Sequence, residues 1–194
     1  MSLRMTMQAT TSLDVTAKVG VLMYDSTFEV DEILAASVDF IRAQGVVVAG
    51  LLQRFGHRLP NGKRSMWVDD IATGMTIRLD QQRGPGAVAC MLDSDALARC
   101  ASLLESATRS LPDLIIVSRF GAAEADGGGM RAEIAEAICS GAAVLIPAKF
   151  TLLNDLEGFL GGPVNLLLPS PIAIADWAKN TVFELATHYD SAGF

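Results

Sequence analysis

The sequence predicts a three-layer α/β fold with a mainly parallel sheet and a small inserted β-hairpin. Continuous apolar runs, typical of buried parallel strands, cover residues 18–24, 46–53, 114–117 and 143–146. The segments between them carry apolar residues at helical spacing, as residues 30–41 do. Because strands alternate with helices, we expect helices to cover both faces of the sheet through right-handed crossovers.

Helix and turn signals separate the first strands. Ser26 and Glu29 have the spacing of a capping box, which predicts that a helix begins here. The turn-rich, basic segment 54–64 predicts an exposed loop after the second strand. Beyond it, Thr73-Gly74 separates two short segments and predicts a hairpin of strands 66–70 and 76–79.

The second half of the chain repeats the alternation of strands and helices. Asp93 or Ser94 can cap the helix that follows the apolar run 87–92. We expect Pro147 to cut the strand that begins at Ala143. The remaining predicted elements are a loop over 119–129, helices over 130–141 and 152–159, a strand over 164–168 and a helix from about 172.

Composition indicates one domain, residues 18–194, after a loosely ordered tail, residues 1–17. A length of 194 residues fits a single domain. Hydrophobic residues make up 51% and charged residues 19%, so we expect apolar surface to meet a second subunit, with a dimer as the favoured homo-oligomer. The net charge of −7 argues against nucleic acid as a partner, because phosphate neutralisation needs a basic surface.

The cysteines and histidines predict neither a metal site nor a catalytic thiol. Cys90, Cys100 and Cys139 form no CxxC pair, and the two histidines are His57 and His188, far from Cys90 in sequence. We therefore expect Cys90 and Cys100 to be small buried side chains without catalytic reactivity, and we expect no metal and a reduced cytoplasmic location. No apolar run reaches the ~18–20 residues of a membrane span, so no membrane insertion is expected.

The turn after the first strand lacks the residues of a nucleotide-binding P-loop. That motif, GxxxxGK[ST], wraps phosphates with backbone N–H groups and holds magnesium through its Ser or Thr. Residues 24–31 read YDSTFEVD, without glycine or lysine and with three acidic side chains. These carboxylates oppose a polyphosphate by Coulomb repulsion, whereas acids in a first helical turn ordinarily stabilise the helix dipole. Asp25 and Ser26 are secondary candidates for a ligand hydrogen bond.

A stronger candidate site follows the strand 114–117. P-loop enzymes place a magnesium-supporting carboxylate after a later strand, but Ser118-Arg119 stands here, which argues against magnesium-dependent hydrolysis. Arg119 and Arg131 flank a loop that ends in Gly127-Gly128-Gly129 at a helix start, and guanidinium groups with free N–H groups can bind an anion. The alternative, of equal weight, is structural: the glycines form a turn and Arg119 pairs with Glu124.

Three further cations are candidates for an anion site. Ligands of open α/β sheets bind beyond the carboxyl ends of the strands, which favours Arg54 after the strand 46–53 and Lys149 after the strand 143–146. Arg83 follows shortly after the basic loop, whose cations could steer an anion or an acidic partner in this acidic protein. We interpret Lys63 and Arg64 as solvated loop residues.

Several segments of the chain resemble an uncharacterised bacterial family. They are GVVVAGLLQ (45–53), DDIATG (69–74), RGPGAVACMLD (83–93), DLIIVSRFGAAEADGGGMRAEIAEAICSGAAVLIP (113–147) and FLGG (159–162). The chain is similar from about residue 18 to residue 169 to this DUF2478-like family, which is often encoded beside molybdate-transport genes and has no established activity. Ser118 stands where the family usually has Asn before Arg-Phe-Gly. A more distant similarity, through strand order and the RFG…E segment, is to P-loop nucleoside-triphosphatases.

These observations predict a P-loop-like accessory protein that binds a small anion or a nucleotide and does not hydrolyse nucleoside triphosphates. The resemblance implies a role in molybdenum metabolism and, as ligands, molybdate, a nucleotide or a molybdopterin-type compound, in that order; the cofactor is otherwise unknown. Two alternatives stay open: a nucleoside-triphosphatase with an atypical site, and a protein–protein adaptor or regulator. No catalytic residue is assigned. The predicted site comprises Arg54, Arg83, Arg119, Glu124, Gly127, Gly128, Gly129 and Arg131, with Asp25, Ser26 and Lys149 as secondary candidates.

Overall fold

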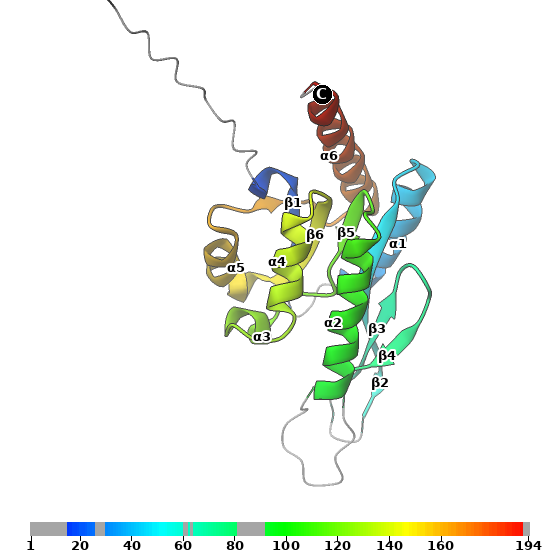
Figure 1. The fold of residues 1–194 in the computed structure, drawn as a ribbon. Coiled ribbons are helices and arrows are strands. Elements are labelled where there is room, and N and C mark those ends of the chain that lie inside the picture. The colour runs from blue at the N-terminus through cyan, green and yellow to red at the C-terminus, as the bar shows by residue number, and fades with distance from the viewer. Residues whose placement is uncertain (1–14, 26–29, 60–61, 63, 81–91, 192–194) are drawn as a thin grey trace, which may run out of the picture.

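Seven strands in the described part of the chain form one sheet, in the order β4-β3-β2-β5-β6-β1-β7 (Figure 1). The computed structural model describes residues 15–25, 30–59, 62, 64–80 and 92–191. The strands are β1 Val19–Tyr24, β2 Val48–Arg58, β3 Arg64–Asp70, β4 Thr76–Arg78, β5 Leu114–Ile116, β6 Ala143–Lys149 and β7 Asn165–Leu166. Strands β2, β5, β6, β1 and β7 run parallel, and β3 and β4 extend the sheet as an antiparallel hairpin.

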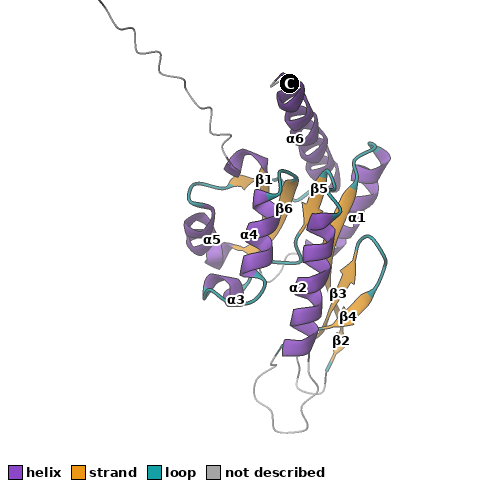
Figure 2. Cartoon of the chain, viewed as in Figure 1, coloured by secondary structure: helices purple, strands orange, loops and turns teal. Residues whose placement is uncertain are grey.

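Helices cover both faces of this sheet (Figure 2). They are α1 Val30–Ala43, α2 Ser94–Arg109, α3 Ala122–Ala125, α4 Arg131–Cys139, α5 Leu153–Leu160 and α6 Pro171–Ser191, with 3-10 turns at Val15–Lys18 and Phe150–Leu152. Because side chains alternate along a strand, Leu22 and Tyr24 pack toward α1 and α6, whereas Val21 and Met23 pack toward α4 and α5. The predicted three-layer α/β fold with a hairpin is therefore confirmed.

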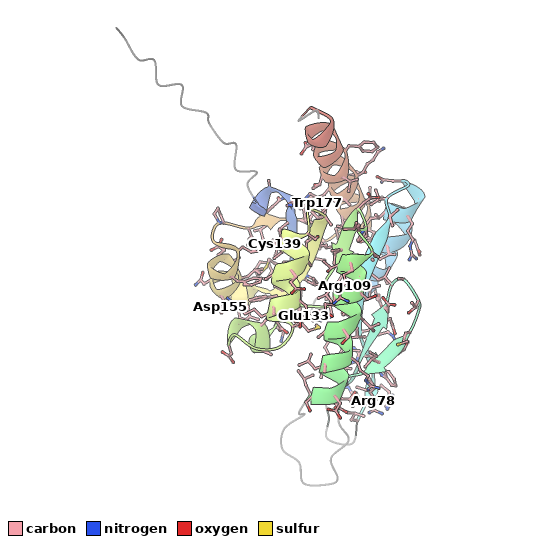
Figure 3. All side chains as sticks on the ribbon, in the orientation of Figure 1. Arg78, Arg109, Glu133, Cys139, Asp155 and Trp177 are labelled. Carbon is pink, nitrogen blue, oxygen red and sulfur yellow. The ribbon has the colours of Figure 1, made fainter. Side chains whose placement is uncertain are left out.

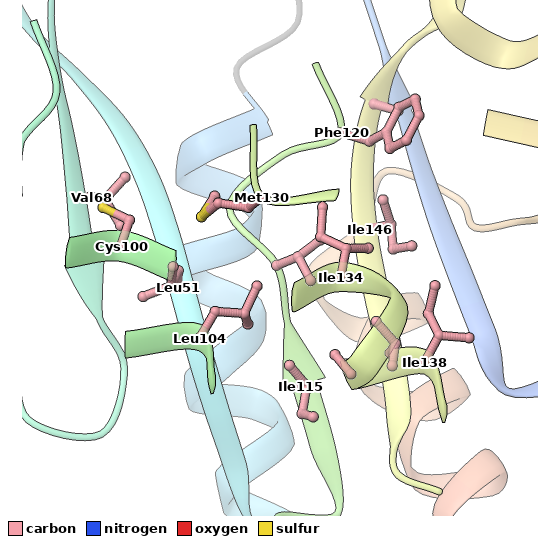
Figure 4. Close-up of a cluster of buried hydrophobic side chains, with 14 of the residues drawn as sticks. Leu51, Val68, Cys100, Leu104, Ile115, Phe120, Met130, Ile134, Ile138 and Ile146 are labelled. Atoms are coloured by element: carbon pink, nitrogen blue, oxygen red, sulfur yellow. The ribbon is translucent and has the colours of Figure 1, made fainter. Parts of the chain in front are cut away.

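The larger core lies between the sheet and α2, α4 and α5 (Figure 4). Ile115 and Ile146 from the sheet meet Leu104 of α2 and Ile134 of α4, and all four side chains are fully buried. Each such side chain stabilises the fold by about 1.5–3 kcal/mol. Of the helices in the described ranges, even the 21-residue α6 lacks the apolar run that crossing a bilayer requires.

Two sequence-based predictions about strand limits are wrong. Residues 54–58 belong to β2 and not to a loop, because β2 continues past the parallel sheet and pairs antiparallel with β3, with Arg54 opposite Trp67. The strand β6 also runs through Pro147 to Lys149. Proline is tolerated there because the neighbouring strand β5 ends at Ile116, so a missing N–H in β6 costs few hydrogen bonds to β5. The Pro147 carbonyl still accepts from the Phe120 N–H at 2.9 Å.

Other predictions are confirmed or fall outside the described residues. Asp93 caps α2, since its Oδ1 accepts from the N–H groups of Asp95 and Ala96. The capping box at 26–29 and nearly all of the apolar run 87–92 lie outside the described residues. The 3-10 turn Val15–Lys18 lies partly within the predicted tail 1–17, and the division into that tail and one domain over 18–194 stays a prediction.

Candidate functional site

Arg119 lies beyond the carboxyl end of β5 and forms an ion pair with Asp31 in the first turn of α1. The Arg119 side chain is only 10% exposed and that of Asp31 only 19%. The second carboxylate oxygen of Asp31 accepts from the Phe55 N–H at 3.1 Å, so the same carboxylate also joins α1 to β2. The sequence-based alternative that Arg119 pairs with Glu124 is therefore wrong, because Asp31 supplies the compensating charge.

Two aromatic rings hold the Arg119 guanidinium in place. Its central carbon lies 4.6 Å from the ring centroid of Tyr24, at the end of β1, and 5.3 Å from that of Phe55 in β2. A guanidinium at this distance is attracted by the ring quadrupole, and the attraction is strongest where water is excluded. The cation is thus fixed by side chains from strands on both sides of β5.

One donor of this fixed cation is left over. The Nε of Arg119 is buried and has no hydrogen-bond partner among the described residues. Lys149 follows on the neighbouring strand β6, is exposed, and lies directly opposite Tyr24 in the parallel register. Paired residues of neighbouring parallel strands point to the same face, so the Lys149 side chain leaves the sheet on the face of Tyr24, whose ring contacts Arg119. This edge can therefore offer positive charge and at least one unused N–H to an anion.

Glu124 stabilises the loop between β5 and α4. Its side chain is buried, and its two carboxylate oxygens accept from the backbone N–H groups of Gly121 at 2.9 Å and of Met130 at 3.0 Å. Gly129 has φ +60°, and a Cβ there would lie 2.1 Å from Glu124 Oε1. Glycine is required at Gly129 because the buried carboxylate occupies the space of a side chain.

Donor groups of Gly127, Gly128 and Arg131, which were predicted to bind an anion, form hydrogen bonds within the protein instead. The Gly127 and Gly128 N–H groups donate to the carbonyls of Glu124 and Ala123, at 3.2 and 2.8 Å. Arg131 Nη1 donates to the Glu124 carbonyl at 2.8 Å, and its guanidinium lies 4.4 Å from the centroid of the Phe159 ring. These groups therefore already have partners inside the protein.

Arg54 lies on the hairpin and not at the end of a parallel strand. It forms an ion pair with Asp69, with 2.5 Å between Nε and Oδ2, and its guanidinium lies 5.5 Å from the Trp67 ring centroid.

Arg78 lies opposite Trp67 on strand β4, and its guanidinium is also 5.5 Å from the Trp67 ring centroid. It forms an ion pair with the buried Asp80 at 2.7 Å. Although burial favours the neutral acid, the hydrogen bonds from Arg78 and from the Met66 N–H hold the pKa of Asp80 below its usual value of 3.8.

Three of the sequence-based candidates remain, Asp25, Ser26 and Arg83. Asp25 is exposed directly after β1, while Ser26 and Arg83 lie outside the described residues. No group of three or more His, Cys, Asp or Glu side chains within the described ranges could hold a metal ion. Sequence reasoning missed Asp31, Tyr24 and Phe55 as partners of Arg119, and the one available signal was the unusual density of acids at the start of α1.

The fold matches that of a solved structure described as a human cancer-related nucleoside triphosphatase. The TM-score is 0.55, with 90% of this chain and 96% of that chain covered, at 12% sequence identity. At this identity the likeness concerns the fold alone.

A curated relative aligns over 165 residues with 32% identity: the molybdenum import ATP-binding protein ModC 2 of Bradyrhizobium diazoefficiens. The alignment covers 84% of this chain but 18% of the relative, so the chain spans about a fifth of that protein's length. A family described as "Protein of unknown function (DUF2478)" matches residues 19–177, which is most of the chain. The chain therefore belongs to the DUF2478 family, as the resemblance of its RFG…GGG segment predicts.

Proposed function

We propose that this protein binds a small oxyanion, molybdate first of all, at the carboxyl ends of β1, β5 and β6, and that it does not hydrolyse nucleoside triphosphates. The observation that carries the proposal is the buried Nε of Arg119, which lacks a partner among the described residues although its guanidinium is held by Asp31, Tyr24 and Phe55. A buried donor without a partner is unfavourable by about 1–3 kcal/mol, and an oxyanion would remove that penalty.

The charge at this edge suits a small anion better than a polyphosphate. Asp31 already neutralises Arg119, so the exposed Lys149 supplies the additional positive charge. A polyphosphate would bring several negative charges toward Asp31 and Asp25 without a P-loop to compensate them. The sequence contains no GxxxxGK[ST] motif, and the segment 24–31 has no lysine to reach a terminal phosphate.

The relative supports molybdenum metabolism as the setting. Its name joins molybdenum import to ATP binding, and this chain aligns with only 18% of it. Since this chain lacks the phosphate-binding motif, we infer that the aligned part serves an accessory role, and that the accessory role concerns the transported oxyanion rather than ATP.

Calorimetric titration with sodium molybdate tests the proposal. We expect saturable binding that Arg119→Gln abolishes and that Lys149→Gln weakens by up to about five-fold, because an exposed charge contributes up to about 1 kcal/mol. Arg109→Gln is the matched control, since Arg109 is 71% exposed and pairs only with Glu105 among the described residues. If the Arg119 variant is unstable, the Lys149 variant still tests the proposal, because replacing an exposed side chain should leave the fold intact.

A second titration distinguishes oxyanion binding from the alternative function, a nucleoside-triphosphatase. Magnesium-ATP in place of molybdate should give neither binding heat nor phosphate release above a heat-inactivated sample. The enzymatic alternative would replace our proposal if the wild-type protein hydrolyses ATP, if Arg119→Gln abolishes that hydrolysis, and if the wild type does not bind molybdate.

We also propose that the protein is a cytoplasmic homodimer. The 51% hydrophobic content and exposed apolar side chains such as Leu168 and Ile172 support a subunit interface, and the free thiols of Cys100 and Cys139 suit a reducing compartment. Light scattering coupled to size exclusion tests the dimer, and a monomeric mass at high concentration would contradict it.

A further inference from the structure

A groove between strand β4 and helix α2 has the size of a small-molecule site. Its volume is about 680 Å³, and pockets that hold small organic ligands commonly measure ~300–1,000 Å³. Its lining residues come from β3, β4, α2 and the turn before β4, and they are distinct from those around Arg119. Figure 3 shows Arg78, one of the lining residues, on the hairpin beside the N-terminal part of α2.

The side chains that line the groove are largely apolar. Ile77 is buried in the larger core, Leu103 of α2 packs against that core, and Met75 is 54% exposed. An unbranched Met side chain adapts to ligands of different shape. The Trp67 ring is already contacted by the Arg78 guanidinium, so we expect the apolar part of a ligand to pack mainly on the aliphatic side chains.

The charge of the groove favours an anion. No carboxylate is among the side chains that line it, although the whole protein carries a net charge of −7. Arg78 forms an ion pair with the buried Asp80. The exposed Arg99 forms no ion pair with a described residue, including Asp95 one turn earlier on α2. A carboxylate on a ligand would therefore find a cation without a competing carboxylate at Arg99.

The two hydroxyl groups of the groove are already used as donors. The Ser102 hydroxyl donates to the Ala98 carbonyl at 3.1 Å, and the Thr76 hydroxyl donates to Asp69 Oδ1 at 2.6 Å. Their oxygens can still accept a hydrogen bond, but they offer no further proton to an anion. The Arg99 guanidinium is then the donor on which an anionic ligand would depend.

We propose that this groove binds a small organic acid, a monocarboxylate with an apolar body. The carboxylate pairs with Arg99, and the apolar body packs on Met75, Ile77 and Leu103. An inorganic oxyanion has no apolar body to bury, so it is not the ligand of this groove. The groove shares no lining residue with the Arg119 edge, so this proposal and the proposed function can fail independently.

Probes that differ mainly in charge test this proposal. Hydrocinnamate, its neutral amide and phenylpropylamine carry nearly the same apolar body, and the methyl NMR signal of Met75 reports their binding. We expect the carboxylate to bind at millimolar concentration or below, the amide to bind about two- to five-fold more weakly, and the amine not to bind. Arg99→Gln should reduce the affinity for the carboxylate to that for the amide.

Control variants on α2 separate the groove from the rest of the helix. Ser102→Trp fills the groove from an exposed position, so it should abolish binding of both the carboxylate and the amide while the fold persists. Arg109→Gln, ten residues or about 15 Å beyond Arg99 along α2, should leave binding unchanged. Excess molybdate should not displace hydrocinnamate.

The proposal fails if the carboxylate and the amide bind equally well, if Arg99→Gln has no effect, or if no probe binds at millimolar concentration. Displacement of hydrocinnamate by molybdate would assign the probe to the Arg119 edge and also overturn it. A concentration-dependent dimer that Ser102→Trp dissociates, with no binding of the probes, would assign the groove to a second copy of the chain instead.

Discussion

The guanidinium of Arg119 bonds to the carboxylate of Asp31, a residue 88 positions earlier in the chain. This pair joins the end of β5 to the first turn of α1, and the bond from the Phe55 N–H adds β2 to the same carboxylate. An anion that binds Arg119 must therefore share the cation with an internal carboxylate. Sharing limits the net charge available to the ligand, and so favours small ligands of low charge.

Removing Arg119 should destabilise the fold. We expect Arg119→Gln to lower the free energy of unfolding by about 1–3 kcal/mol, because it leaves the half-buried Asp31 carboxylate with a weaker partner. Urea unfolding of the wild type, Arg119→Gln, Asp31→Asn and the double variant measures the coupling between the two residues. Strictly additive effects would mean that the pair contributes nothing of its own.

We expect alanine substitutions at Gly129 and at Gly127 to destabilise the fold by different amounts, because only Gly129 packs against the Glu124 carboxylate. Gly129→Ala should cost about 2–4 kcal/mol, because its Cβ would meet Glu124 Oε1 at 2.1 Å. Gly127→Ala should cost about 1–2 kcal/mol, since φ is +89° but no atom lies within 4 Å of the added Cβ. Thermal or urea unfolding compares them, and equal losses would argue against close packing of Glu124 on Gly129.

Two cysteines should differ in reactivity. Burial raises the pKa of the Cys100 thiol to about 11, although the nearby Arg99 lowers it in part, so little thiolate forms at pH 8. Cys139 is exposed at the end of α4. Iodoacetamide should modify Cys139 and spare Cys100 until the protein is unfolded, as peptide mass spectrometry can determine. Rapid modification of Cys100 in the native protein would contradict its burial.

Asp80 should contribute stability that depends on pH. Its folded-state pKa lies below the unfolded value of 3.8, so the contribution is fully present above that value and is lost as pH falls through the folded pKa. The difference in melting temperature between wild type and Asp80→Asn should thus be largest above about pH 5 and shrink toward pH 3. The exposed Asp126 offers Asp126→Asn as a control. A difference that stays constant down to pH 3 would show that Arg78 does not stabilise the charged form.

The apolar strands were predictable because burial on both faces leaves a continuous signal in the sequence. Residues 114–116 and 143–146 carry it, and both segments are fully buried strands. Residues 54–58 carry no such signal, since this end of β2 pairs with β3 and is itself largely exposed. These residues are extended because they pair with β3. Which strands pair depends on the three-dimensional fold, so the local sequence does not reveal it.

The sequence could place some of the candidate residues at one edge of the sheet, but it could not indicate their contacts. Arg119 and Lys149 could be chosen because both follow apolar strands, whose carboxyl ends meet at one edge of the sheet. The contacts with Asp31, Tyr24 and Phe55 depend on how α1 and β2 lie in space. Glu124 was predicted to belong to the anion site or to pair with Arg119, whereas its carboxylate accepts from the backbone N–H groups of Gly121 and Met130, which no residue pattern identifies.

The place of β1 in the sheet has a consequence for synthesis on the ribosome. It is made first among the described strands, yet its two neighbours are β6 and β7, so more than 100 residues must emerge before it can pair. The hairpin of β2, β3 and β4 can form long before that, because its contacts are local. A nascent or truncated chain that ends before residue 143 would leave β1 and β5 as unpaired apolar edges. Such chains should depend on chaperones and aggregate readily, even when the hairpin half is already folded.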